Sequence, residues 1–237
     1  MSDLRIAMIT EGPTDKIVLD SALNAFLDGN FVSKVLQPEQ SDSLSGFGNL
    51  KGWGGVFQYC RQLSEMGPLG WGFLDKFDLI IFHLDADVAE KSYSDYPHIN
   101  YPHTDLPCVQ PCPPVMDTIT SLYAVISGWL NLDSLDSVPS HWVFCIPSKS
   151  IEAWIIAGLY FKDYPNIETL ECNSKLGSWL SQRPIRTNSR LKKNKKAYET
   201  IANDLTDHWA NIEKYCTEAL RFKKNVLKIT KNNGRGT

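Results

Sequence analysis

The sequence predicts an α/β fold in which helices flank a mostly parallel sheet. Short apolar runs, suited to buried strands, alternate with longer segments of helical periodicity. The strongest of these runs end at acidic residues or at turn-forming Gly and Pro. The chain has 237 residues, of which 43% are apolar and 22% charged. It is therefore large enough to bury a sizeable core.

The first unit is predicted to be a strand, a tight turn and a helix. Residues 4–9 (LRIAMI) form a short apolar run typical of a buried strand. Glu11 follows, and the Gly-Pro dipeptide after it breaks the strand. Either Thr14 or Asp15 can cap the helix that the spacing of apolar residues predicts over 16–27.

The next units repeat this pattern. Residues 31–36 alternate apolar and polar side chains, which predicts a second strand. A loop rich in Gly and Ser is expected over 41–55, and a helix over 56–66. Residues 77–84 (FDLIIFHL) give the strongest strand signal in the chain, and it ends at the Asp-Ala-Asp triplet 85–87.

The remaining elements complete the predicted domain. Six prolines within 91–114 exclude a long helix or central strand and predict a surface insertion. A helix over 116–130 precedes a strand over 141–146. Residues 150–160 then form an apolar helix that carries one acid, Glu152.

These elements divide the chain into three parts. Residues 1–160 are expected to form the α/β domain, with the proline-rich insertion inside it. Residues 161–229 are expected to form a helical and basic C-terminal extension, and 230–237 a disordered tail.

Four acids follow predicted strands: Glu11, Asp85, Asp87 and Glu152. The carboxyl ends of parallel strands meet at one edge of a sheet, so these side chains are expected to lie together. In extended geometry Asp85 and Asp87 would also point to the same side. Oxygen ligands of this kind suit Mg²⁺ or Mn²⁺. Glu11 could complete the metal site or move a proton, and a buried Glu152 would need a metal or a cation such as Lys149 as its partner.

Basic residues are concentrated in the C-terminal part of the chain. The net charge is −3, yet residues 183–196 hold seven basic and no acidic residues. Such a segment is typical of a phosphate clamp, although a solvated loop has the same composition. The residues expected to bind substrate phosphates are Lys149, Arg186, Arg190, Lys192 and Lys193.

The motifs resemble those of the Toprim superfamily, whose pattern is a Glu after the first strand and an Asp-x-Asp after a later one. Here these are Glu11 and Asp85-Ala-Asp87, and the stretch Ile146 to Trp154 (IPSKSIEAW) is similar to small stand-alone bacterial Toprim proteins. These are related to RloB-like proteins and to the overcoming-lysogenization-defect nucleases. The resemblance covers roughly residues 4–160. It implies a Toprim-like, Rossmann-like sheet, with Glu152 as a ligand or support of a second metal.

The resemblance implies an Mg²⁺-dependent nuclease that acts on DNA or RNA, in phage defence or DNA repair. The chain shows no ATPase domain, primase zinc module or topoisomerase tyrosine domain, which argues against those roles. One alternative is a non-catalytic or partner-activated subunit that works with an ATPase. A phosphatase or nucleotidyl transferase can also use Asp-x-Asp, but an Asp-nucleophile phosphatase usually has its doublet after the first strand. A homodimer remains open.

Other residues allow two interpretations each. His98, His103, Cys108 and Cys112 are possible zinc ligands, but their spacing matches no standard knuckle. His83 either faces the acids with Asp85 or is a satisfied core histidine. Trp53 lies in the Gly-rich loop, either as a stacking surface for a base or as a buried anchor.

The sequence contains no apolar run of roughly 18 residues or more that would span a bilayer, and its N-terminus has no cleavage signature. A cytoplasmic protein without a membrane partner is therefore expected. The six cysteines are accordingly expected to be free thiols.

Overall fold

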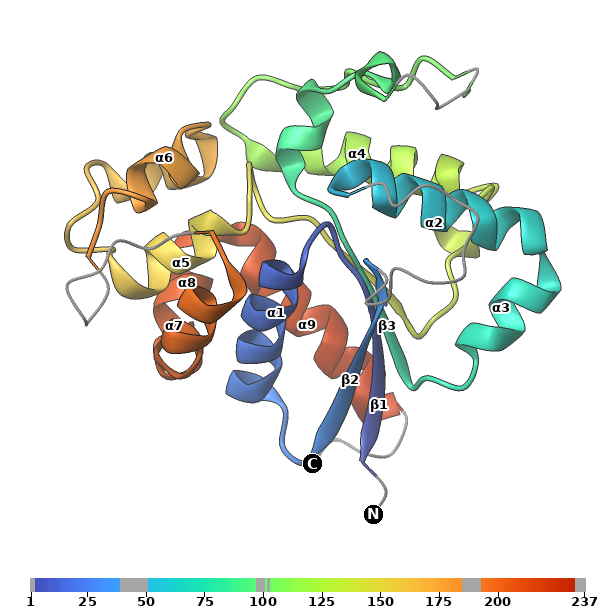
Figure 1. The fold of residues 1–237 in the computed structure, drawn as a ribbon, viewed down its shortest axis with the longest axis horizontal. Helices are drawn as coiled ribbons and strands as arrows, with labels where there is room; N and C mark the ends of the chain where they lie inside the picture. The colour runs from blue at the N-terminus through green and yellow to red at the C-terminus, as the bar shows by residue number, and fades with distance from the viewer. Residues whose placement is uncertain (1–2, 39–50, 97–100, 102, 185–192, 233–237) are drawn as a thin grey trace.

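A four-stranded, all-parallel sheet forms the centre of the protein (Figure 1). This architecture is seen in a computed structural model that describes residues 3–38, 51–96, 101, 103–184 and 193–232. The strands lie in the order β2-β1-β3-β4. Their bounds are Leu4–Ile9 for β1, Phe31–Gln37 for β2, Leu79–His83 for β3 and Trp142–Cys145 for β4. The predicted parallel α/β sheet is confirmed.

Burial explains which strands were easiest to predict. The central strand β3 is buried at every position, and β1 at every position except Arg5. Strands covered on both faces have continuous apolar sequences. The edge strand β2 is partly exposed and alternates, which is the pattern of its sequence.

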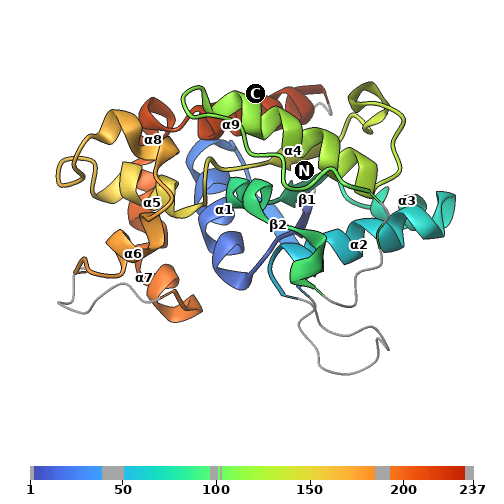
Figure 2. The same cartoon turned by 90° about the horizontal axis from the view of Figure 1, so that it is seen from above.

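Helices cover both faces of the sheet (Figures 1 and 2). One face packs against α1 and the C-terminal helices, and the other against α2 and α4. The α-helices are α1 (Pro13–Phe26), α2 (Trp53–Met66), α3 (Pro68–Leu74), α4 (Val115–Trp129), α5 (Glu152–Leu159), α6 (Leu176–Leu180), α7 (Lys195–Asp207), α8 (Trp209–Tyr215) and α9 (Thr217–Asn232). Short 3₁₀ helices are η1 (Ala86–Glu90), η2 (Tyr93–Asp95), η3 (Leu135–Ser137) and η4 (Ile167–Cys172).

The C-terminal helices belong to the same core as the sheet. Trp154 of α5 is fully buried, with its ring centroid 5.3 Å from that of Trp209 in α8 and 6.0 Å from that of Phe222 in α9. The predicted extension is helical, but it covers a face of the sheet rather than standing apart. The tail was predicted to begin at residue 230, which is wrong, because α9 continues to Asn232 and buries Thr230.

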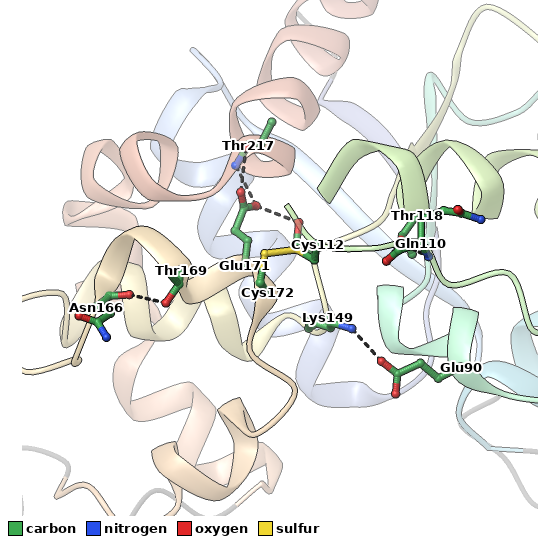
Figure 3. Close-up of a disulfide and its surroundings, with 11 residues drawn as sticks. Glu90, Gln110, Cys112, Thr118, Lys149, Asn166, Thr169, Glu171, Cys172 and Thr217 are labelled. Atoms are coloured by element: carbon green, nitrogen blue, oxygen red, sulfur yellow. Dashed lines mark hydrogen bonds and ion pairs between the residues drawn. A yellow bond between two sulfur atoms is a disulfide. The ribbon is translucent and has the colours of Figure 1, made fainter. Parts of the chain in front are cut away.

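A disulfide between Cys112 and Cys172 joins the proline-rich insertion to η4 (Figure 3). The expectation of six free thiols is wrong at these two positions, because it rested on chain length and expected location and could not detect proximity across 60 residues. Cys112 is therefore not available as a zinc ligand. Cys108 is a free thiol, and His98 lies outside the described residues.

Two local expectations also change. Helix α2 begins at Trp53 rather than at residue 56, and α3 was not predicted. Trp53 is 5% exposed, and its ring lies 4.9 Å from that of Tyr96 and 6.3 Å from that of Trp129. The buried-anchor interpretation of Trp53 is therefore confirmed. Among the described helices, none is long and apolar enough to cross a membrane.

Candidate functional site

The strand ends bring Glu11, Asp85 and Glu152 to one edge of the sheet, as the parallel topology predicted. Glu11 Oε1 accepts a hydrogen bond of 2.7 Å from the backbone N–H of Asp85. Asp85 Oδ1 in turn accepts one of 2.9 Å from the N–H of Ile151, which immediately precedes α5. Backbone donors thus connect the carboxyl ends of β1, β3 and β4 through two carboxylates.

Asp87 lies at a different depth from Asp85. β3 ends at His83, and the chain turns into η1 rather than continuing as a strand, with the Asp87 N–H donating to the Lys149 carbonyl at 2.8 Å. The Asp85 side chain is 10% exposed and that of Asp87 is 46% exposed. The expectation that strand alternation aligns the two carboxylates is therefore wrong, because the backbone is no longer extended at Asp87.

Glu152 is buried and has a cationic partner. Its Oε1 lies 2.8 Å from Lys193 Nζ and accepts a 3.1 Å hydrogen bond from the Tyr198 hydroxyl. The suggestion of Lys149 as that partner is wrong, since Lys149 Nζ lies 2.7 Å from Glu90 Oε1 (Figure 3).

The predicted phosphate-binding residues therefore have different outcomes. Lys193 reaches the acids, and Lys149 points to Glu90. Arg186, Arg190 and Lys192 lie outside the described residues.

Two further polar side chains complete the cluster. His83 is fully buried, with Nδ1 3.7 Å from Asp15 Oδ2 and Nε2 3.6 Å from Asp85 Oδ1. Neither ring nitrogen has a hydrogen-bond partner among the described residues. Burial, and then Lys193, lowers the pKa of His83 to about 3, so the ring is neutral. Of the two interpretations of His83, the structure supports the one in which it faces Asp85.

Asp15 is the acid that sequence reasoning missed as a site residue. It was considered only as a helix cap, and its Oδ2 does accept a 2.8 Å hydrogen bond from the Gly12 N–H. It is also 3% exposed and close to His83. Its place four residues after Glu11, on the first turn of α1, was the available signal.

Burial and mutual repulsion keep several of these acids from ionising readily. Burial, and then the negative charge of Asp15, raises the pKa of Glu11 to about 8. Burial raises the pKa of Asp15 to about 6, although Lys193 opposes this shift. The pKa of Asp85 lies well above its usual range because of burial and then Glu11. Carboxylates that are removed from water and repel one another favour the approach of a cation.

Glu152 differs from the other acids. Burial alone would raise its pKa, but the Lys193 ammonium outweighs this and holds the pKa below its usual value. The same ammonium opposes the upward shifts in the pKa values of Glu11, Asp85 and Asp87 without reversing them. Lys193 thus supplies a positive charge that partly compensates the acids from the solvent side.

The donor set suits a hard divalent cation, because it consists of carboxylate oxygens. The residues that would hold the ion are Glu11, Asp85, Asp87 and Glu152. Among the described residues, no group of three or more His, Cys, Asp or Glu side chains is arranged to hold a metal ion. Glu11 and Asp85 are turned toward backbone N–H groups, and Glu152 toward Lys193.

Comparison of the chain with protein-family models, with curated proteins and with solved structures finds no match in any of the three. The fold class is therefore defined by the structure itself. It is an α/β protein with a four-stranded parallel sheet between helices, of the Rossmann-like type.

Proposed function

We propose that the protein is an Mg²⁺-dependent nuclease of the Toprim type that cleaves phosphodiesters of DNA or RNA at the carboxyl edge of its sheet. The observation that carries the proposal is the clustering of mutually repelling acids, with Asp15 and Asp85 buried and Glu11 partly buried, at the edge where α/β proteins bind ligands. Such a cluster is costly without a compensating cation. The order of Glu11, Asp85 and Asp87 along the chain, which resembles the Toprim pattern, supports the type of site.

When bound, the metal would supply Lewis-acid stabilisation of charge on the phosphate oxygens. The chain's own residues have separate tasks in this proposal. Glu11, with its raised pKa, exchanges a proton with the attacking or leaving oxygen near neutral pH. Asp85 and Asp87 hold the cation, and Glu152 supports a second position. His83 stays neutral beside Asp85, with Nε2 3.6 Å from Asp85 Oδ1.

A second candidate is the partner-activated subunit considered above. The observation that favours it is the engagement of Glu152 by Lys193 and of Asp85 by Ile151. Rearrangement of these contacts by a partner would free the carboxylates. The phosphatase alternative is disfavoured, since Glu11 follows β1 and the doublet follows β3.

The test compares the wild type with the Asp85→Ala/Asp87→Ala double variant. Calorimetry with Mg²⁺ and with Mn²⁺ measures metal binding, and labelled single- and double-stranded DNA and RNA measure cleavage. We expect the wild type to bind the metal and to cleave nucleic acid, and the variant to do neither. As a matched control, Asp133→Ala/Asp136→Ala removes two exposed acids of the segment between α4 and β4 and should leave metal binding and cleavage unchanged.

Equal metal binding by the wild type and the Asp85→Ala/Asp87→Ala variant would overturn the metal site. Metal binding without cleavage by the wild type would instead favour the partner-activated subunit.

A further inference from the structure

A groove of about 730 Å³ runs between α1 and α7 and begins at Glu11. This volume lies within the about 300–1,000 Å³ of typical ligand sites. Each wall presents side chains at intervals of four residues, which places them on one face of a helix. The two walls carry the same series of Lys, acid and Asn: Lys16, Asp20 and Asn24 on α1, and Lys195, Glu199 and Asn203 on α7.

The two helices run in the same direction along the groove. Lys193, just before α7, reaches Glu152 and influences Asp15 at the start of α1. Further along, the Thr206 hydroxyl donates a 3.0 Å hydrogen bond to the Ser21 carbonyl. The lysines of the two walls therefore lie nearest the acids at the sheet edge, and the asparagines lie farthest from them. The positive ends of both helix dipoles also point toward the acid end.

Two lysines at this end are free to meet an anion. Lys51 is exposed and forms no ion pair with a carboxylate of the described residues. Lys195 Nζ lies 3.8 Å from Glu199 Oε1, and both side chains are more than half exposed, so that pair is weak. Lys16 is different, because it already pairs with Asp20 and donates to Ser33 Oγ at 2.8 Å.

We infer that this groove binds a single-stranded segment of nucleic acid that extends from the scissile phosphodiester at Glu11. Phosphates would lie between Lys51 and Lys195, and sugar and base would lie toward Asn24 and Asn203, whose amides both donate and accept. The inference rests on the proposed function and specifies its substrate class. A duplex is too wide to enter the groove, because α1 and α7 pack against each other beside it and the major groove of a duplex is by itself about 12 Å wide.

The experiment measures binding without cleavage, by fluorescence anisotropy in EDTA, so that metal chemistry plays no part. The probes are a labelled 12-nucleotide strand, as DNA and as RNA, the matching duplexes, and a labelled mononucleotide. Lys51→Ala/Lys195→Ala tests the groove, and Lys162→Ala/Lys175→Ala is the control, because it removes the same charge from exposed positions outside the groove. Asn203→Trp fills the groove without changing charge, and thermal melting checks that each variant is folded.

We expect the wild type to prefer the single strand over the duplex. The groove variant should weaken strand binding by about tenfold and lower the slope of log K against log salt by about 1.4, the value for two phosphate contacts on a single strand. The Trp variant should also weaken it, and the control should not.

Equal effects of the groove and control pairs, tighter binding of the duplex, or binding of the mononucleotide as tight as the strand would each overturn the inference. Cleavage that depends on Asp85 and Asp87 but not on the groove lysines would overturn it while leaving the nuclease proposal intact. Strand binding in the groove without any cleavage would overturn the nuclease proposal and leave the groove as a binding site for single strands.

Discussion

Lys193 Nζ lies 2.8 Å from Glu152 Oε1, so the first described residue after the gap at 185–192 neutralises an acid at the sheet edge. Lys193 is 60% exposed and Glu152 is 4% exposed. The lysine can therefore leave toward solvent, whereas the carboxylate cannot. A cation that binds the acids would compete with this ammonium for Glu152.

The variant Lys193→Ala should lose about 1 kcal/mol of stability in EDTA, because a buried carboxylate loses a partner that is itself half in solvent. The gain in melting temperature on adding Mg²⁺ should be larger in this variant than in the wild type. Lys195→Ala, whose ion pair is exposed, is the control and should match the wild type. An unchanged Mg²⁺ response in Lys193→Ala would contradict competition between the lysine and the metal.

The raised pKa of Glu11 predicts a pH-dependent stability. The pKa is about 8 in the folded protein and 4.5 ordinarily, so the folded state binds the proton more tightly. This contribution is fully present below pH 4.5 and is lost as pH rises through 8. In EDTA, the wild type should therefore lose more stability than Glu11→Gln between pH 5 and 8. Melting scans across this range measure the difference, and parallel curves would show that Glu11 ionises normally.

Asp85 has a structural task that can be separated from metal binding. Its carboxylate accepts the Ile151 N–H, and Asn retains a carbonyl oxygen for that bond. Urea denaturation in EDTA should find Asp85→Asn close to the wild type. Asp85→Ala should be about 1–3 kcal/mol less stable, because a buried donor is left without a partner. Both variants should lose Mg²⁺ binding in calorimetry, and retention by Asp85→Asn would remove Asp85 from the ligands.

The disulfide should contribute strongly to stability. Closing a loop between Cys112 and Cys172, 60 residues apart, stabilises a protein by about 4 kcal/mol in the chain-entropy treatment. Cys112→Ser should therefore lower the urea midpoint under non-reducing conditions, and dithiothreitol should lower that of the wild type equally. Cys108→Ser, which removes a free thiol of the same segment, should have little effect. A wild-type midpoint that does not respond to dithiothreitol would contradict the prediction.

Much of the sheet could be predicted because a buried strand has a continuous apolar run in its local sequence. Strands β1 and β3 are covered on both faces, and their apolar runs gave their positions to within a residue or two. Once the strands were taken as parallel, the placement of Glu11, Asp85 and Glu152 at one edge followed from topology.

What could not be predicted depends on contacts between distant segments. The pairing of Glu152 with Lys193 spans two helices and the gap between them, and no local pattern distinguishes Lys193 from its basic neighbours. The turn that separates Asp85 from Asp87 depends on the carbonyls of Pro147 and Lys149 in another strand connection. Asp15 was hidden by its second task as a cap for the Gly12 N–H.

The position of α9 in the chain has a consequence for how the molecule is made. Phe222 and Val226 of α9 are fully buried against the sheet face, and Lys193 and α7 also follow Glu152 in the chain. On the ribosome, the nascent polypeptide emerges from its N-terminus, so Glu11, Asp85 and Glu152 are synthesised well before the segments that enclose them. A growing chain would thus carry its acids without the surrounding pocket, and the assembled site arises only after α7 and α9 have been synthesised.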